Sequence, residues 1–99
     1  MIFVSVLSER AYSELLEAWE WYEDKQEGLG DRFKDQIFIS LNNIEKNPFK
    51  GTQRKQSFRE VPVKTFPYII IYRIESETSR IYVDSVFHTS RNPGKKYKK

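Results

Sequence analysis

The run Tyr68-Ile-Ile-Ile-Tyr72 constrains the fold more than any other stretch of this 99-residue chain. Its apolar side chains fill both alternations of a strand, so both faces of that strand must be buried. The pattern therefore predicts a central strand over residues 67–75. The polar stretch that follows, ESETSR at 75–80, is typical of a turn, and a further strand follows over residues 80–88.

A hairpin closed by that turn determines which side chains share a face. If Ile74 lies opposite Ile81, strict alternation fixes the remaining pairs. The predicted core face then carries Tyr68, Ile70, Tyr72, Ile74, Ile81, Val83, Ser85 and Phe87. The other, half-polar face carries Ile69, Ile71, Arg73, Tyr82, Asp84, Val86 and His88. On it Arg73 lies diagonal to Asp84, close enough for an ion pair.

The residues before these strands are typical of one short strand and a helix. The apolar run 2–7 suits a strand, and Ser8 is a favourable N-cap for the helix that follows. We expect this helix to end near Lys25, before the glycines at positions 28 and 30. Its predicted inner stripe is formed by Ala11, Leu15, Ala18 and Tyr22, widened by Tyr12, Leu16 and Trp19.

A second helix is predicted to start near Asp31, whose carboxylate can cap it, and to end at Asn47-Pro48. Its inner stripe is formed by Phe33, Ile37, Leu41 and Ile44. The short glycine-containing link makes the two helices an antiparallel hairpin. After a polar basic loop, KGTQRKQS at 50–57, a strand over residues 58–64 precedes the central one.

Taken in order, these elements predict an α+β fold of the type β-α-α-β-β-β. The helical hairpin packs on one face of a mainly antiparallel, twisted sheet, in which the first strand can lie at the centre or at an edge. The length suits one domain, residues 1–93, followed by a basic tail at 94–99 that we expect to be mobile when free.

Composition narrows the possible functions. The chain has no cysteine and a single histidine, His88, which excludes a thiolate site and makes a transition-metal site unfavourable. We therefore expect no metal and no cofactor. The apolar start lacks a basic flank and is too short for a signal peptide or a membrane span. These features predict a soluble, cytoplasmic protein without a membrane partner.

Charge is divided unevenly along the chain. Residues 1–49 hold five basic and ten acidic side chains, whereas residues 50–99 hold twelve basic and four acidic ones. A surface polarised in this way offers a cationic face to an anionic partner. A basic tail that only aids solubility is the alternative interpretation.

Two groups of segments give the chain a family resemblance. The first group is the initial strand, ELLEAWEWYE, GLGDRF and the NP after the second helix; the second is FREVPVKTFPYIIIYRI followed by VFHTSRNP. In this order they resemble toxins of the RelE/ParE superfamily, found in bacterial type II toxin–antitoxin and plasmid-stabilisation modules. The FPY and the H-x-x-R-N-P are similar to the ParE-like branch. The resemblance implies a small toxin that a cognate antitoxin holds in a hetero-oligomer.

The resemblance implies two principal activities. RelE-like members cut messenger RNA on the ribosome, whereas ParE-like members inhibit DNA gyrase. Metal-independent RNA cleavage needs a proton donor and acceptor and cations around the phosphate. The residues available for it here are His88, Arg59, Lys64, Arg73 and Arg91. However, Pro67-Tyr68 stands where the ribonucleases bring an arginine into the central strand, and proline cannot replace a cation.

The non-enzymatic, ParE-like function is therefore favoured, with the ribonuclease as the first alternative. A weakly toxic or inactive member, or a nucleic-acid-binding module, is the second. For the favoured function, the residues expected to bind the target are Lys50, Arg54, Lys55, Arg91, Lys95, Lys96, Lys98 and Lys99. The apolar side chains Trp21, Phe38 and Ile39 fall outside the helical stripes, which makes them either a wider core or an exposed contact for the antitoxin. An exposed sheet edge could also accept a strand of the antitoxin.

Overall fold

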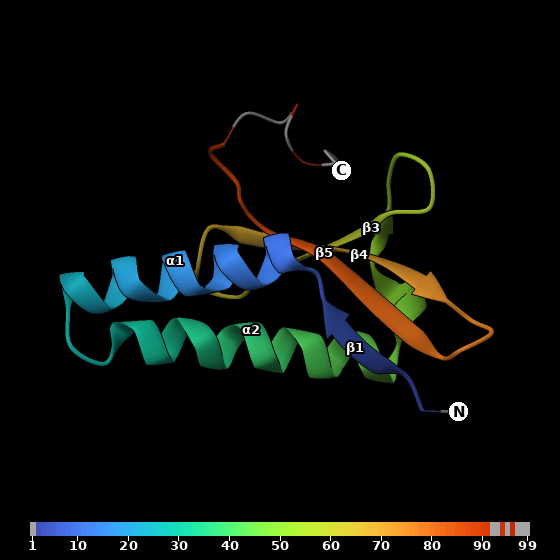
Figure 1. Ribbon diagram of the computed structural model, residues 1–99, viewed down its shortest axis with the longest axis horizontal. Helices are drawn as coiled ribbons and strands as arrows, with labels where there is room; N and C mark the ends of the chain where they lie inside the picture. The colour runs from blue at the N-terminus through green and yellow to red at the C-terminus, as the bar shows by residue number, and fades with distance from the viewer. Residues whose placement is uncertain (1, 92–93, 95, 97–99) are drawn as a thin grey trace.

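Two antiparallel helices lie along one side of a five-stranded sheet in a computed structural model that describes residues 2–91, 94 and 96 (Figure 1). In chain order the elements are β1 (Val4–Leu7), α1 (Glu9–Lys25), α2 (Leu29–Lys46), the 3₁₀ turn η1 (Pro48–Lys50), β2 (Thr52–Gln53), β3 (Arg59–Pro62), β4 (Tyr68–Glu75) and β5 (Arg80–His88). The predicted α+β architecture and order of elements are confirmed. The two-residue strand β2, which lies inside the predicted basic loop, is an addition.

The strand rich in isoleucine lies at the centre of the sheet, as its burial pattern predicts. The strand order is β1-β5-β4-β3-β2, so two strands lie on each side of β4. It pairs antiparallel with β3 and β5, and Ile74 lies opposite Ile81 as expected. The first strand, whose position the sequence leaves open, forms one edge and runs parallel to β5.

The main core lies between the helices and the sheet. It is built from the predicted inner stripes of both helices and from the helix-facing residues of β4 and β5, including Ile70, Tyr72 and Val83. Ser8 caps α1 as predicted, because its side-chain oxygen accepts a hydrogen bond from the Ala11 N–H. Tyr12 and Leu16, which were expected to widen the stripe, are exposed instead.

The start of α2 differs from the prediction. Gly28, with φ of 84°, is its N-cap, and Asp31 makes no cap. The Glu23 carboxylate, reaching from α1, accepts hydrogen bonds from the N–H groups of Gly28 and Gly30 at 3.0 Å each. A side chain of the neighbouring helix thus accepts the hydrogen bonds of the free N–H groups at the start of α2, which is usually the role of a local N-cap side chain. Asp31 instead accepts a hydrogen bond from the Trp19 indole N–H.

The register of β5 shifts in the middle of the strand, and this overturns part of the predicted face assignment. Tyr72 pairs with Val83 but Ile71 pairs with Ser85, so Asp84 is an extra residue in β5. Beyond this bulge Val86 joins the main core. Phe87 instead packs on the outer face in a second cluster with Phe58, Ile69 and Ile71.

Because of the same shift, His88 lies opposite Tyr68, so both side chains are on the helix side of the sheet. Strict alternation had placed His88 on the outer face. The predicted ion pair is also replaced: Asp84 lies 3.7 Å from the Arg10 guanidinium, while the Arg73 guanidinium stacks over the Tyr82 ring at 4.7 Å.

The close approach of the two helices at Gly30 gives a test of the packing. A Cβ there would lie 2.6 Å from the Trp19 carbonyl oxygen, and backbone atoms cannot yield as a flexible side chain can. Gly30→Ala should therefore lower the free energy of unfolding by about 1–3 kcal/mol, although alanine is the better helix former. Ser13→Ala on the exposed face of α1 should change it by less than about 0.5 kcal/mol. Urea denaturation measures both, and equal stability of the two variants would contradict this packing.

Candidate functional site

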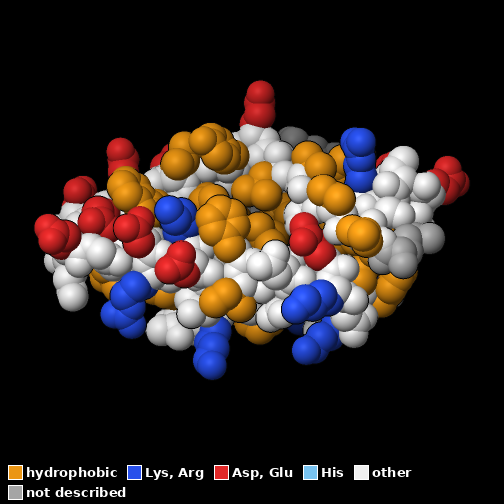
Figure 2. Space-filling view, turned by 90° about the horizontal axis from the view of Figure 1, so that it is seen from below, with side chains coloured by type: hydrophobic (Ala, Val, Ile, Leu, Met, Phe, Trp, Pro, Cys, Tyr) orange, Lys and Arg blue, Asp and Glu red, His pale blue; other side chains and the backbone are white. Residues whose placement is uncertain are grey.

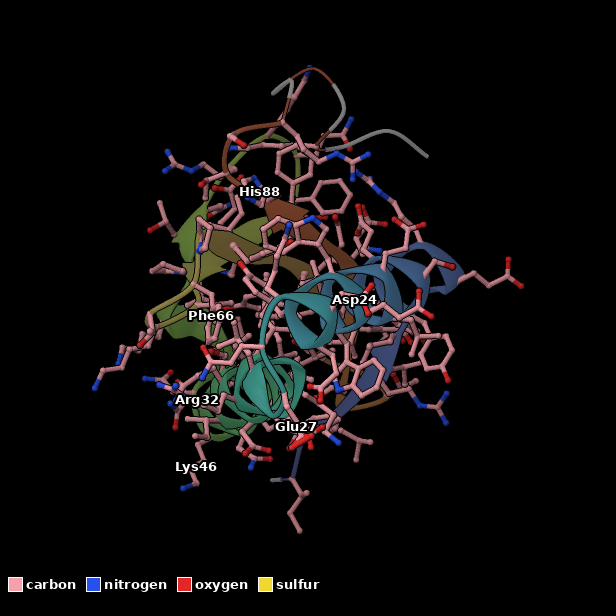
Figure 3. All side chains as sticks on the ribbon, turned by 90° about the vertical axis from the view of Figure 1, so that its left-hand side faces the viewer. Asp24, Glu27, Arg32, Lys46, Phe66 and His88 are labelled. Atoms are coloured by element: carbon pink, nitrogen blue, oxygen red, sulfur yellow. The ribbon has the colours of Figure 1, made fainter. Side chains whose placement is uncertain are left out.

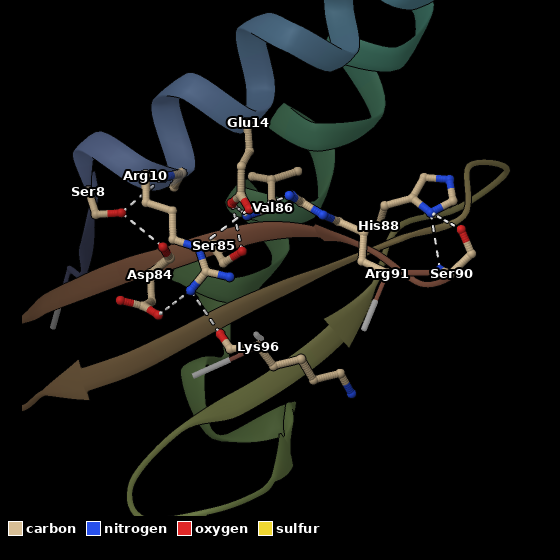
Figure 4. Close-up of polar contacts among 11 residues, drawn as sticks. Ser8, Arg10, Glu14, Asp84, Ser85, Val86, His88, Ser90, Arg91 and Lys96 are labelled. Carbon is tan, nitrogen blue, oxygen red and sulfur yellow. Dashed lines mark hydrogen bonds and ion pairs between the residues drawn. The ribbon is translucent and has the colours of Figure 1, made fainter. Parts of the chain in front are cut away.

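Strand β1 pairs with the first half of β5, and residues at the start of α1 form hydrogen bonds with the second half. The Ser8 N–H donates to the Val83 carbonyl, and the Ser8 hydroxyl donates to the Asp84 carbonyl at 2.9 Å. Further along, the Glu14 carboxylate accepts hydrogen bonds from the Ser85 hydroxyl at 2.6 Å and from the Val86 N–H at 3.0 Å. Polar groups of β5 that lie past the end of β1 are therefore satisfied by α1 (Figure 4).

The second carboxylate oxygen of Glu14 forms ion pairs with two guanidinium groups. Arg10 and Arg91 each place a nitrogen 3.4 Å from it, and the Glu14 side chain is only 10% exposed. Arg10 also donates to the Lys96 carbonyl at 3.0 Å, which places Lys96 near the start of α1. Glu14 is thus the point where α1, β5 and the residues after β5 meet (Figure 4).

His88 lies at the end of β5, on the side of the molecule where α1 lies (Figure 3). Its ring contacts the Tyr68 ring edge-to-face at a centroid distance of 4.9 Å. The Ser90 N–H donates to Nδ1 at 3.1 Å, so in the neutral ring Nδ1 is the acceptor and Nε2 carries the proton. That bond leaves Nε2–H as the donor of the ring.

A cavity of about 360 Å³ lies between α1 and the ends of β4 and β5. Tyr68 and His88 line it from the sheet, Arg91 from the segment after β5, and Glu14, Glu17, Trp21 and Tyr22 from α1. Burial, followed by the nearby Tyr22 hydroxyl, raises the pKa of Tyr68 to about 12. Glu14 and Glu17 add to that rise in pKa, whereas Arg91 opposes it.

The five residues proposed for RNA cleavage do not converge. Of the five, His88 and Arg91 line the cavity described above, and the other three do not. Arg59 donates to the carbonyls of Phe49 and Gly51, next to η1. Arg73 lies on the outer face over Tyr82, and Lys64 follows β3 as an exposed side chain.

Two of the basic segments proposed for target binding meet at one acidic side chain. Glu60, on β3, has one oxygen 3.4 Å from Arg54 and the other 3.5 Å from Lys96. The Glu60 side chain is only 8% exposed. Lys96, in the tail that we expect to be mobile when free, lies against Glu60 on β3. Lys50 and Lys55 are exposed on the same loop as Arg54, while Lys95, Lys98 and Lys99 lie outside the described residues.

The three apolar residues proposed for the antitoxin are all exposed, yet they point in different directions. Trp21 lines the cavity on one flank of α1. Phe38 lies two helical turns before Glu45, which bonds to Ser5 of β1, so it is on the side of α2 that faces β1 and α1. Ile39 lies one residue further around the helix, toward solvent.

A second group of exposed apolar side chains lies between the two helices. Tyr12 lies two turns before Trp19, which bonds to α2, so Tyr12 and Leu16 are on the α2-facing side of α1. With Phe38 they form three exposed apolar side chains along the hairpin, which we call the hairpin seam. Seen from the α2 side, apolar side chains gather along the middle of the molecule and acidic ones at the hairpin end (Figure 2).

Sequence reasoning missed Glu14, Tyr68 and Glu60 as parts of candidate functional surfaces. Glu14 had no signal of its own, because one glutamate among many on α1 looks solvated until β5 is placed beside it. Glu60 carried a weak signal, since an acidic residue between Arg59 and Val61 stands alone in a basic segment. Within the described part of the chain, no three side chains gather as a metal-ligand set, and no helix is long and apolar enough to cross a bilayer.

Comparisons with known proteins place the fold and the family. The sequence model described as "ParE toxin of type II toxin-antitoxin system, parDE" matches residues 6–93. A chain of a "Chromosomal ParDE TA system from P. aeruginosa" superposes with a TM-score of 0.77 at 10% identity, covering 90% of this chain and 98% of that one. A mutant of the E. coli toxin RelE in the free state gives a TM-score of 0.68 at 17% identity, covering 91% and 86%. No curated protein sequence matches the chain.

The raised pKa of Tyr68 predicts a loss of stability at alkaline pH. The ordinary pKa of a tyrosine is 10.0, and burial raises the pKa of Tyr68 to about 12 in the folded protein. Between these values the unfolded chain has lost a proton that the folded protein keeps, so the stabilisation is complete below pH 10 and falls as the pH rises towards 12. Tyr68→Phe should reduce this fall in denaturation curves, and the exposed Tyr12→Phe should not. Identical alkaline profiles for the two variants would be inconsistent with this environment.

Proposed function

Because the chain belongs to the ParE toxin family of type II toxin–antitoxin systems, we propose that it inhibits DNA gyrase by binding it and that a cognate antitoxin neutralises it. An inhibitor of this kind forms and breaks no covalent bond. It must bind one conformation of the target more tightly than the others, because equal affinity for all of them shifts no equilibrium. The toxin therefore needs a specific docking surface rather than a catalytic centre.

The observation that carries the proposal is the meeting of two basic segments at Glu60. Arg54 from the loop and Lys96 from the C-terminal segment, 42 residues apart in the numbering, bind the two oxygens of one carboxylate. This arrangement brings Lys96 to the same side of the molecule as the loop that carries Lys50 and Lys55. Such a surface suits an acidic protein patch or DNA phosphates, both of which a gyrase–DNA complex offers.

The separation of the candidate catalytic residues argues for binding over cleavage. Phosphoryl transfer needs cations positioned around the scissile phosphate together with the proton donor. In the described chain Arg59 is committed to backbone carbonyls and Arg73 to an aromatic ring on the opposite face. His88 has one guanidinium beside it, that of Arg91, and this group is paired with Glu14.

For the antitoxin we propose the hairpin seam of Tyr12, Leu16 and Phe38 as the apolar contact. Antitoxin segments that fold on binding gain much of their affinity by covering exposed apolar side chains. The edge of β1 is less suited to adding a strand, because the Glu45 carboxylate already accepts the Ser5 N–H there. The seam also lies on a different surface from Glu60, which leaves room for an antitoxin to hold the toxin without blocking its basic loop.

The gyrase proposal predicts a charge-dependent inhibition. Purified toxin should block supercoiling of relaxed plasmid by gyrase, and it should leave ribosome-bound message intact in a translation extract. Replacing Lys50, Arg54 and Lys55 together by glutamine should weaken inhibition by about tenfold or more, with a smaller effect at high salt. The matched control replaces Arg32, Lys34 and Lys46 on α2, which removes the same charge from another surface.

Three outcomes would count against this function. Message cleavage that is lost in His88→Ala would identify a ribonuclease. Equal loss of inhibition in the two triple variants would mean that only net charge matters. An absence of effect in both assays would identify an inactive member of the family.

The seam proposal predicts that neutralisation and toxicity can be separated. Leu16→Asp combined with Phe38→Asp places two charges where apolar side chains would be covered, so the antitoxin should no longer rescue growth although the toxin still inhibits it. Ile39→Asp, an equally exposed apolar position on the solvent side of α2, is the matched control and should still be rescued. Rescue of the double variant would move the antitoxin contact elsewhere.

A further inference from the structure

The cavity beside His88 has walls suited to a cation. Tyr68 contacts His88 edge-to-face, the rings of Tyr22 and Tyr68 have centroids 6.4 Å apart, and Trp21 meets Tyr22 at 5.1 Å with an interplanar angle of 86°. Aromatic faces attract cations through their quadrupole. Trp21 already does so, because the Lys25 ammonium lies 4.8 Å from the centre of its ring.

The cavity also contains negative charges, which a cation-binding site needs: those of Glu14 and Glu17. Glu14 lies on its wall and Glu17 on the exposed side of the same helix, and both raise the pKa of the Tyr68 hydroxyl. Glu14 is fully used by Ser85, Val86, Arg10 and Arg91. Glu17, in contrast, makes no ion pair with any residue that the structure describes, so its carboxylate is available to an incoming donor.

In the free protein the cavity already holds a cation of the same chain, the guanidinium group of Arg91. Arg91 places a guanidinium nitrogen 3.4 Å from Glu14, and its side chain is 50% exposed. A single long, half-exposed contact of this kind contributes little free energy. Glu14 would keep Arg10, Ser85 and Val86 without it, so Arg91 can leave the cavity without stranding a buried charge.

We propose that this cavity binds an arginine side chain of a protein partner, which displaces Arg91 and pairs with Glu17. A guanidinium fits better than an ammonium, because its plane stacks on aromatic rings while its edge donates two hydrogen bonds to one carboxylate. An anion would have to approach Glu14 and Glu17, which oppose it. The inference holds whichever target the toxin has, since it depends only on the cavity.

A short peptide tests the inference directly. The full chain, labelled with 5-fluorotryptophan, is titrated with an acetylated, amidated Gly-Ser-Arg-Ser-Gly peptide while the fluorine resonances of both tryptophans are followed. The Trp21 resonance should shift and that of Trp19, outside the cavity, should not. A citrulline peptide, which keeps the shape and removes the charge, should give no shift, and the lysine peptide should bind several-fold more weakly than the arginine peptide.

Two variants identify the groups involved. Glu17→Gln should weaken peptide binding by about fivefold, whereas Glu20→Gln on the same helix, away from the cavity, should leave it unchanged. Arg91→Ala should strengthen binding by about threefold, because it removes the internal competitor. This increase separates displacement from ordinary surface attraction.

Other results would overturn the proposal. A shift with the citrulline peptide, no shift of Trp21, or weaker binding in Arg91→Ala would each exclude an arginine site. Inorganic phosphate in place of the peptide should leave Trp21 unchanged, and a shift that depends on Arg91 would assign the cavity to anions instead. The variants of the basic loop and of the hairpin seam change other residues. A negative result in the peptide titration would therefore not bear on gyrase inhibition or on antitoxin binding.

Discussion

The carboxylate of Glu14 joins the helical hairpin to β5 at the point where that strand becomes irregular. One of its oxygens accepts the Val86 N–H and the Ser85 hydroxyl, and the other faces Arg10 and Arg91. Because Val86 is buried, an unpaired backbone donor at this position would cost about 1–3 kcal/mol. With Glu14 in place the bulge at Asp84 is stabilised, Val86 turns inward, Phe87 turns outward, and His88 comes to lie beside Tyr68. The position of the cavity follows from that one contact.

Local sequence patterns predicted the elements well because the forces that set them are local. Helical spacing, the Ser8 cap and the isoleucine-rich strand each gave the correct element, and β5 was predicted over the residues it occupies. The register was correct from Ile74 to Tyr72 and failed one residue later. No glycine or asparagine marks the bulge at Asp84. Its partners, Ser8 and Glu14, are about seventy residues away in the sequence, so alternation alone could not reveal it.

The same reason explains what the sequence missed at the site. His88 was named as a candidate residue but assigned to the wrong face, because its face depends on the bulge. Asp31 was a reasonable local cap, yet Glu23 from the neighbouring helix took that role. Arg54 and Lys96 were chosen for their charge, and only the folded chain brings them to one glutamate. Errors therefore arose wherever a side chain from a distant segment replaced a local partner.

Three surfaces of the molecule have distinct physical characters. The surface around Glu60, with Arg54 and Lys96, is cationic, and the hairpin seam is apolar. The cavity beside His88 combines aromatic walls with carboxylates. The fold is shared with both a ParDE chain and RelE, so it cannot by itself decide between binding and cleavage. The placement of Arg59 and Arg73 favours binding over cleavage, because the two guanidinium groups lie on opposite faces of the sheet.

Amide hydrogen exchange at Val86 tests most directly whether Glu14 holds this arrangement together. In the native protein the Val86 N–H should be protected, and Glu14→Ala should speed its exchange by about tenfold or more while Ile81, earlier in β5, keeps its protection. Local loss of protection at Val86 is the predicted result. Unchanged exchange at Val86 in Glu14→Ala would contradict the account, because the strand would then hold its bulge without the helix.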